Sequence, residues 1–414
     1  MPVTTLSRSQ KIGLALTGLF MLIGLATWII QTMEGLTLTN MRNSYSWGLY
    51  VSALAFFVGN AAGGLVLTSS IYLFGATRLK PFAKIGALTA FANVTAAMLV
   101  IIPDMGRPFR LFNLLLHPRF SSPLVWDVIV LSLYALLSLL YLYLLLLPDF
   151  SGKLEKIALR TRNREAFSET WCRRLAPVSL LAAVGIHVVT AWIFATQGAR
   201  GWWHSAVLAP DFIALAMASG TALVLLVCVL VYGTGESTRQ PYRILSLFIA
   251  VPFFIHLFFM YNDFVIEAWY GSSESLSILA ITLRDNLPAH VLEVMLPLAA
   301  VILLLNQRVR TSAAAVVSSC CLLMLGVVVH RFLLMPGAFN QVPMTIQPLG
   351  LQHGEWSLPM ASGDYGPGLE TFVTFWDYFP SPVELVIFLG ALAFMACVVL
   401  AGTSRLPLVN QDQG

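Results

Sequence analysis

Ten long apolar stretches separated by short polar connections run through this chain of 414 residues. One helical crossing of a bilayer needs about 20 apolar residues, and each stretch comes near or above that length. The stretches are uniformly apolar rather than alternating, which favours a helical bundle over a membrane barrel. We therefore expect an all-α integral membrane protein with about ten transmembrane helices and both termini on one side. The predicted spans are 12–30, 47–75, 85–103, 123–147, 175–197, 210–232, 244–267, 288–305, 313–335 and 382–401.

Hydrophobic residues make up 58% of the chain and charged residues 11%. Because soluble domains carry about 25% charged residues, we expect little soluble mass outside the membrane. The net charge of +4 is small and gives no indication of a nucleic-acid partner. The first apolar run lacks a small-residue cleavage site, so we expect it to remain as a transmembrane helix.

The cysteines lack the C-x-x-C spacing of an iron–sulfur or zinc framework. They lie in or beside apolar runs, which is typical of buried thiols. They are Cys172, Cys228, Cys320, Cys321 and Cys397. We therefore expect no iron–sulfur cluster in this chain, so any such cluster belongs to another subunit.

Lysines and arginines in the connections predict the orientation of the helices. The connections on the side of the termini carry seventeen of them, and those on the opposite side carry six. We therefore expect both termini to be cytoplasmic, in a bacterial or archaeal cytoplasmic membrane. Residues 149–174 on the cytoplasmic side are basic and predict an amphipathic interfacial helix.

A long outer segment, residues 336–381, contains no lysine or arginine. A connection of this length is usually functional or disordered. Its aromatic residues include Trp356, Tyr365, Trp376 and Tyr378. We interpret it as a docking surface for an extracytoplasmic partner, or alternatively as a lid that only covers the helix ends.

Residues 101–127 place ionisable and helix-breaking residues at the outer ends of two spans. Ionisable groups at membrane depth are costly, so such a cluster is a functional-site hypothesis. Ser122-Pro123 predicts a helix start, which puts Asp127 just over a turn into the helix and near the same face as Asp104. A quinone arrives through lipid, and its quinol needs an acid/base pair when it releases two protons. The predicted quinone site consists of Asn60, Asp104, Arg107, His117 and Asp127.

Two alternatives remain open at this cluster. Asp104 and Arg107 could form an interfacial salt bridge that only ends a helix. Asn60 lies beside Gly63 and Gly64, a pattern that also indicates close helix packing.

A second polar stripe lies in the span 244–267. His256, Met260, Asp263 and Glu267 are spaced 4, 3 and 4 residues apart, which puts them on one helix face. Ionisable groups on such a stripe predict a proton relay, although a packed polar network between helices is an equally simple explanation. The candidate relay residues are His187, His256, Asp263, Glu267, His290, Glu293 and Arg331. His187 and His256 could also ligate a haem, an alternative that their spacing does not favour.

Several longer motifs together resemble the NrfD family, the quinone-reactive membrane subunits of polysulfide reductase-type complexes. The similarity covers nearly the whole chain and is closest to the ten-helix branch, which includes membrane subunits of hydrogenase-2, the sulfite-reduction-associated transmembrane complex, the quinone reductase complex and alternative complex III. The motifs are GLTLTNMRNSYSWGLYVSALAFFVGNAAGG, IIPDMGRPFRLFNLLLHPRFSSPLVWDV, GIHVVTAWIFATQGARGWWHS, YNDFVIEAWYGS and HRF.

The resemblance implies two four-helix bundles with one additional helix at each end of the chain. The corresponding divisions are 1–46, 47–197 for the first bundle, 198–335 for the second, 336–381 for the outer loop and 382–414. The family's quinol-site pair falls on Asp104 and Asp127, although many ten-helix members have His in place of Asp104. Positions proposed to conduct protons in the family fall on His187, His256, Asp263, Glu267, Glu293 and Arg331.

The resemblance also implies the function. We expect a membrane-anchor subunit that exchanges electrons between menaquinone or ubiquinone and an extracytoplasmic iron–sulfur subunit. That subunit would connect to a molybdopterin-type, hydrogenase or multihaem cytochrome subunit, where the substrate chemistry occurs. This chain itself would hold no haem or iron–sulfur cluster. The alternatives are a structural anchor without a quinone site and a secondary transporter.

Overall fold

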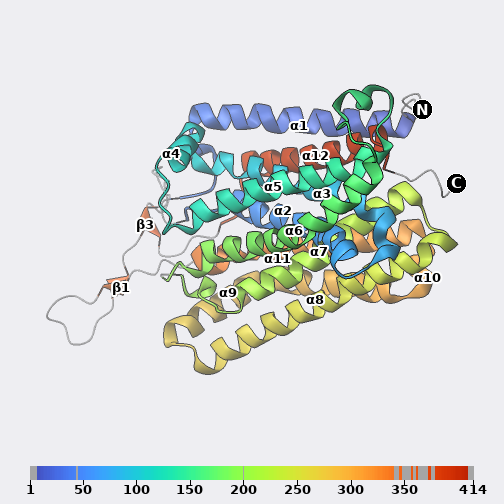
Figure 1. The fold of residues 1–414 in the computed structure, drawn as a ribbon. Coiled ribbons are helices and arrows are strands. Elements are labelled where there is room, and N and C mark those ends of the chain that lie inside the picture. The colour runs from blue at the N-terminus through green and yellow to red at the C-terminus, as the bar shows by residue number, and fades with distance from the viewer. Residues whose placement is uncertain are drawn as a thin grey trace.

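The computed structural model describes residues 7–42, 45–198, 200–339, 345–346, 356–357, 360–361, 372–373 and 378–408. Within these residues, ten helices are long and apolar enough to cross a membrane. Each coincides with one of the spans predicted from the sequence, so the all-α membrane fold is confirmed. The even number of crossings brings both termini to one end of the molecule (Figure 1). We call the opposite end the distal end.

The ten spanning helices are α1 (Arg8–Glu34), α2 (Leu49–Leu73), α3 (Ala83–Val100), α5 (Pro123–Leu146), α6 (Arg164–Ala195), α7 (Leu208–Tyr232), α8 (Glu236–Tyr270), α9 (Ser273–Leu305), α11 (Ala313–Phe339) and α12 (Pro382–Arg405). Two short α-helices connect them, α4 (Leu111–Leu116) and α10 (Gln307–Arg310). Seven 3₁₀ turns complete the described helical segments: η1 (Leu36–Leu38), η2 (Thr77–Phe82), η3 (Ile102–Met105), η4 (Pro108–Arg110), η5 (Leu147–Asp149), η6 (Gly152–Ile157) and η7 (Gly201–Trp203).

The structure describes four two-residue strands. The labelled strands β1 and β3 lie beyond the distal end (Figure 1). Strand β1 (Thr345–Ile346) pairs antiparallel with β2 (Trp356–Ser357). Strand β3 (Met360–Ala361) pairs in the same way with β4 (Phe372–Val373). These short ladders do not change the helical class of the fold.

The helices divide into two groups of four by their packing. Helices α2, α3, α5 and α6 pack together as the first bundle, and α7, α8, α9 and α11 as the second. Helix α12 packs between α1 and α3, so both terminal helices lie side by side against the first bundle (Figure 1). Helices α2 and α7 join the bundles at a glycine contact, where a Cβ added to Gly63 would lie 2.2 Å from the carbonyl carbon of Gly220.

The predicted interfacial helix over residues 149–174 is wrong in its extent. This segment forms η5 and η6, and then α6 begins at Arg164 and continues into the membrane. Gly152 adopts a positive φ of 61°, which interrupts regular helical geometry. The α6 helix starts later, where the Asn163 side chain accepts a hydrogen bond from the backbone N–H of Ala166 as the N-cap. The basic residues therefore lie on a loop and on the first turns of a spanning helix.

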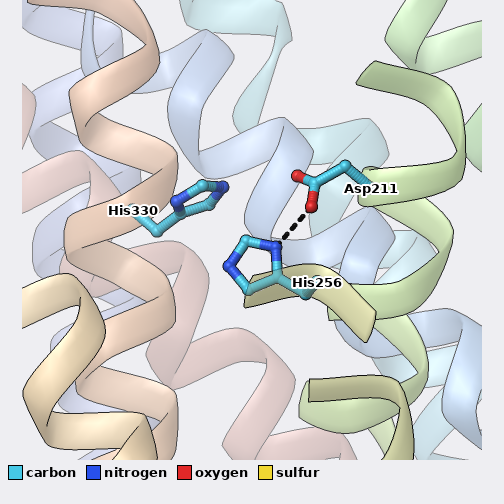
Figure 2. A group of neighbouring side chains, drawn as sticks. All are labelled: Asp211, His256 and His330. Atoms are coloured by element: carbon cyan, nitrogen blue, oxygen red, sulfur yellow. Dashed lines mark hydrogen bonds and ion pairs between the residues drawn. The ribbon is translucent and has the colours of Figure 1, made fainter. Parts of the chain in front are cut away.

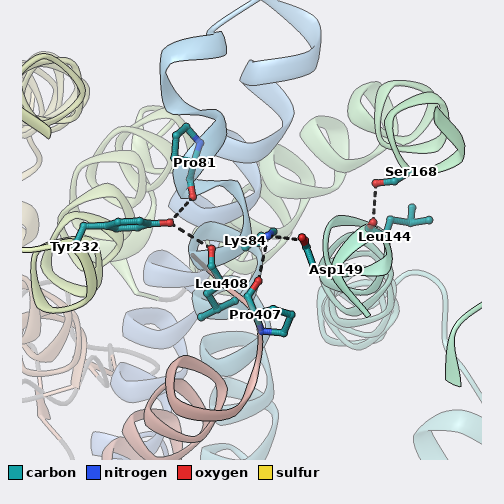
Figure 3. Close-up of polar contacts among 8 residues, drawn as sticks. All are labelled: Pro81, Lys84, Leu144, Asp149, Ser168, Tyr232, Pro407 and Leu408. Atoms are coloured by element: carbon teal, nitrogen blue, oxygen red, sulfur yellow. Dashed lines mark hydrogen bonds and ion pairs between the residues drawn. The ribbon is translucent and has the colours of Figure 1, made fainter. Parts of the chain in front are cut away.

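Polar contacts fasten the chain at the end that carries the termini (Figure 3). Lys84 of α3 donates to Asp149 at 2.8 Å and to the carbonyl oxygen of Pro407 at 3.1 Å. The Tyr232 hydroxyl contacts the carbonyl oxygens of Pro81 at 2.9 Å and Leu408 at 3.3 Å. The segment after α12 is thus tied to both bundles.

Most of the predicted docking segment lies outside the described residues, including Tyr365 and Trp376, and Trp356 is described only as part of β2. Tyr378 is described and is 3% exposed. Its ring stacks on Tyr45, and its hydroxyl donates to Glu384 and accepts from the backbone N–H of Leu49. Tyr378 therefore packs against the helix ends and is not available to a docking partner.

Candidate functional site

The distal end of the first bundle brings Asp104 beside two residues that the sequence interpretation did not include. Gln31 of α1 donates a hydrogen bond to the carbonyl oxygen of Pro103 at 3.0 Å and accepts one from the Tyr50 hydroxyl. Tyr50 and Asp104 lie close enough to interact electrostatically. One carboxylate oxygen of Asp104 is buried and has no hydrogen-bond partner among the described residues. Asp104 therefore offers an acceptor to a ligand at this end.

Glu384 of α12 is a fully buried acid near the half-buried Asp104. Glu384 accepts hydrogen bonds from the backbone N–H groups of Asn40 and Ser381, and from the Tyr378 hydroxyl. Ser381 also caps the helix with its hydroxyl, which completes the capping box that the sequence indicates. Glu384 is thus satisfied by the fold, whereas Asp104 is not.

Asp127 lies on α5, just over one turn from the helix start at Pro123. It is 4% exposed, and it accepts a hydrogen bond of 2.7 Å from the Thr190 hydroxyl of α6. The helix begins where Ser122-Pro123 predicts, although the Ser122 hydroxyl makes no capping bond. A buried carboxylate with one neutral donor is a group that can accept a proton from a bound quinol.

Among the described residues, neither Asp104 nor Asp127 bonds to another of the predicted quinone residues. Arg107 and His117 are exposed, and among the described residues no ion pair joins Asp104 to Arg107. Asn60 is fully buried, ten residues along α2 from Tyr50, which is about 15 Å of helix. Both polar atoms of its side-chain amide lack a partner among the described residues.

The second bundle contains a continuous series of buried acids and histidines. His256 of α8 bonds through Nδ1 to Asp211 of α7 at 2.5 Å (Figure 2). His330 of α11 and His290 of α9 each bond through Nδ1 to Glu293, at 2.8 Å and 2.6 Å. The rings of His256 and His330 meet edge to face, with their centroids 4.9 Å apart. We call these five residues the second-bundle polar chain.

A cavity of about 110 Å³ opens beside this polar chain. Asp211, His290, Glu293 and His330 are among the residues that line it. The predicted α8 stripe contributes Met260, Asp263 and Glu267, and apolar walls come from residues such as Phe259, Phe264 and Leu333. The volume accommodates several water molecules next to polar side chains. This cavity therefore lies in the second bundle, whereas the predicted quinone acids lie in the first.

His187 and Arg331 lie near each other across the boundary between the bundles. They interact electrostatically, and Arg331 is 1% exposed, with its guanidinium carbon 3.9 Å from the centroid of the Phe212 ring. Two of its nitrogens lack a partner among the described residues. Arg331 is also attracted to Asp211, which links it to the polar chain.

Sequence reasoning missed Asp211, His330 and Ser205 as site residues. Ser205 donates to Asp263 at 2.6 Å, and both residues line the cavity. The sequence does mark His330, because it is an ionisable residue beside Arg331 within an apolar span. Asp211 resembles an ordinary acid in the first turn of a helix. The pairing of Asp211 with His256 depends on packing between α7 and α8 and has no local signal.

Comparison with known proteins gives the family. Residues 37–343 match the model of the family described as polysulphide reductase, NrfD. The chain belongs to the NrfD family. It is 31% identical to a dimethyl sulfoxide reductase membrane protein of Halobacterium salinarum, over 95% of this chain and 91% of that protein.

Two more distant relatives also match. A selenate reductase component of Mesobacillus selenatarsenatis is 24% identical over 62% of this chain and 65% of the relative. An Hdr-like menaquinol oxidoreductase integral membrane subunit of Archaeoglobus fulgidus is 25% identical over 49% of this chain and 46% of the relative. NrfD-family similarity thus spans the described residues of both bundles.

Proposed function

We propose that this NrfD-family chain is the quinone-reactive membrane subunit of an oxidoreductase complex. It would exchange electrons between a membrane quinone and an extracytoplasmic iron–sulfur subunit that docks at the distal end. The names of the relatives support a membrane subunit of a reductase, and the menaquinol named for the Archaeoglobus protein favours menaquinone over ubiquinone. Substrate chemistry would occur on a molybdopterin-type, hydrogenase or multihaem cytochrome subunit.

The observations that carry this proposal are two acids of the first bundle, the half-buried Asp104 after α3 and the buried Asp127 near the start of α5. Asp104 has a carboxylate oxygen without a partner among the described residues, and Asp127 receives the Thr190 hydroxyl. Apolar residues between α3 and α5 and at the start of α5 are more than 40% exposed, including Phe109, Phe112 and Trp126. An apolar quinone could reach the acids from the bilayer, and they would accept the two protons that its quinol releases.

Asp127→Asn tests the proposal in the assembled complex. The amide keeps the shape of the carboxylate but cannot accept the quinol proton, so quinone-linked turnover should fall to background. Turnover driven by an artificial dye that bypasses quinone should persist. Asp285→Asn is the matched control, because Asp285 is a surface acid beside Arg284 and should leave both activities unchanged. Normal quinone-linked turnover in Asp127→Asn would instead favour a purely structural anchor.

We further propose that the second bundle moves protons during turnover. The support is the series Asp211–His256 and His330–Glu293–His290, which adjoins a cavity lined by Asp263 and Glu267. Arg331 and His187 would extend this series toward the first bundle.

His256→Gln tests the relay in liposomes that contain the complex. The proton-to-electron ratio should fall while the bound quinone per chain stays at the wild-type level. An unchanged ratio would leave the second-bundle polar chain with a packing role only.

A further inference from the structure

We propose that Asp211, His256 and His330 form a binding site for a divalent transition-metal ion of the zinc type. The three side chains come from α7, α8 and α11, and one potential ligand atom from each lies within 4.8 Å of the other two. Figure 2 shows the two imidazole rings and the carboxylate directed toward one another. Two imidazole nitrogens and one carboxylate oxygen are a known set of zinc ligands.

The spacing of these atoms is close to that of a formed site. Zinc binds nitrogen and oxygen at about 2.0–2.2 Å, which puts two tetrahedral ligands about 3.4 Å apart. The side chains therefore need to move by little more than about 1 Å, which small rotations provide. Metal binding would displace the proton shared by Asp211 and His256, since a metal ligand must be deprotonated at the atom that binds.

The groups behind His330 favour a ligand role. His330 donates from Nδ1 to Glu293 at 2.8 Å, while its Nε2 is buried and has no partner among the described residues. His290 bonds to the other oxygen of Glu293 at 2.6 Å and fixes that carboxylate. A histidine whose second nitrogen donates to an oriented carboxylate is the usual arrangement of a metal ligand.

The cavity provides access and favourable charge. Asp211 and His330 line it together with three further carboxylates, those of Asp263, Glu267 and Glu293. Among the described lining residues there is no lysine or arginine. Arg331 lies close enough to Asp211 to interact with it electrostatically, and its guanidinium stacks on the Phe212 ring. The acidic lining concentrates cations, and the cavity has room for the water that completes a three-ligand site.

The metal site does not depend on the proposed function. The effect of a bound ion on proton movement does rest on that proposal. A bound ion would occupy atoms of Asp211, His256 and His330 that the proposed proton relay requires. Zinc should therefore inhibit proton movement through the second bundle while the first-bundle acids remain accessible to quinone.

The test uses the purified full-length chain in detergent after treatment with a chelator. Co²⁺ should give the visible d–d bands of a low-coordinate nitrogen and oxygen site, and Zn²⁺ should displace it with one ion retained per chain after desalting. Asp211→Asn and His330→Ala should lose the bands and the retained ion. Glu293→Gln should weaken Zn²⁺ binding by about 10- to 100-fold, the usual effect of removing an orienting carboxylate.

His117→Ala is the matched control, because His117 is exposed and remote in sequence from the three ligands. It should bind like the wild type. Gel filtration and thermal melting identify any variant that fails to fold. If His330→Ala fails to fold, the isosteric Asp211→Asn still tests the proposal. The proposal is overturned if wild-type protein retains no ion, or if folded Asp211→Asn retains it. The quinone assay of Asp127→Asn is independent of either result.

Discussion

Gly63→Ala should destabilise the protein, because the two bundles meet backbone to backbone at this position. The new Cβ would lie 2.2 Å from the Gly220 carbonyl carbon and 2.4 Å from the Thr221 nitrogen. Both contacts are backbone atoms, so no side-chain rotation relieves them and α2 must move away from α7. Overpacking lowers the free energy of unfolding by about 1–3 kcal/mol, whereas the higher helix propensity of alanine raises it by about 1 kcal/mol. We expect a net loss near the upper limit, about 2 kcal/mol, or roughly a 30-fold change in the unfolding equilibrium.

The assay is reversible unfolding of the detergent-solubilised chain in a denaturant titration, followed by helical circular dichroism. Gly18→Ala on α1 is the matched control, since a Cβ there would meet nothing within 4 Å. That variant should be as stable as the wild type or up to about 1 kcal/mol more stable. If Gly63→Ala unfolds at the same denaturant concentration as Gly18→Ala, the close approach of the bundles is refuted.

Two further variants test single buried hydrogen bonds. Tyr134→Phe removes a hydroxyl that donates to the Ala61 carbonyl oxygen at 2.5 Å. It should lower the free energy of unfolding by about 1 kcal/mol in the same denaturant titration. An unchanged denaturation midpoint would contradict that hydrogen bond. Thr190→Val removes the hydroxyl that donates to Asp127 at 2.7 Å, and it should lower quinone-linked turnover while dye-linked turnover stays near wild type. Because it leaves a buried carboxylate without that donor, it should also cost about 1–3 kcal/mol of stability. Equal losses in both activities would indicate a general packing defect instead.

The spanning helices were predictable because the bilayer leaves a chain few choices. Backbone groups in lipid must bond internally, so every apolar run of sufficient length becomes a helix. The start of α6 was not predictable by the same reasoning. The charged residues between Arg164 and Arg174 lower the local hydropathy, so an apolar window begins only after them. The helix nevertheless begins at Arg164 and includes these charged turns. Hydropathy detects the part of a helix that lipid contacts and gives no information on the part outside.

Candidate site residues could be predicted where the signal lies within one helix, and could not where it depends on tertiary packing. Asp263 and Glu267 were found because helical spacing puts them on one face with Met260, and all three line the cavity. Gln31 and Asp211 were missed because their partners, Pro103 and His256, lie 72 and 45 residues away in sequence. Spacing within one helix is readable from sequence, whereas the partner of a lone polar residue depends on which helices pack together.

Helix α6 belongs to the first bundle and also packs against α7 of the second bundle. Thr190 bonds to Asp127 in the first bundle, and His187 lies one turn earlier on the same face of α6. His187 in turn interacts with Arg331 of the second bundle, which is attracted to Asp211. Packed and charged groups between two sites are one route for coupling, and these residues lie between the first-bundle acid and the polar chain. We therefore expect a change of charge at Asp127 to reach the second bundle through α6 and α11.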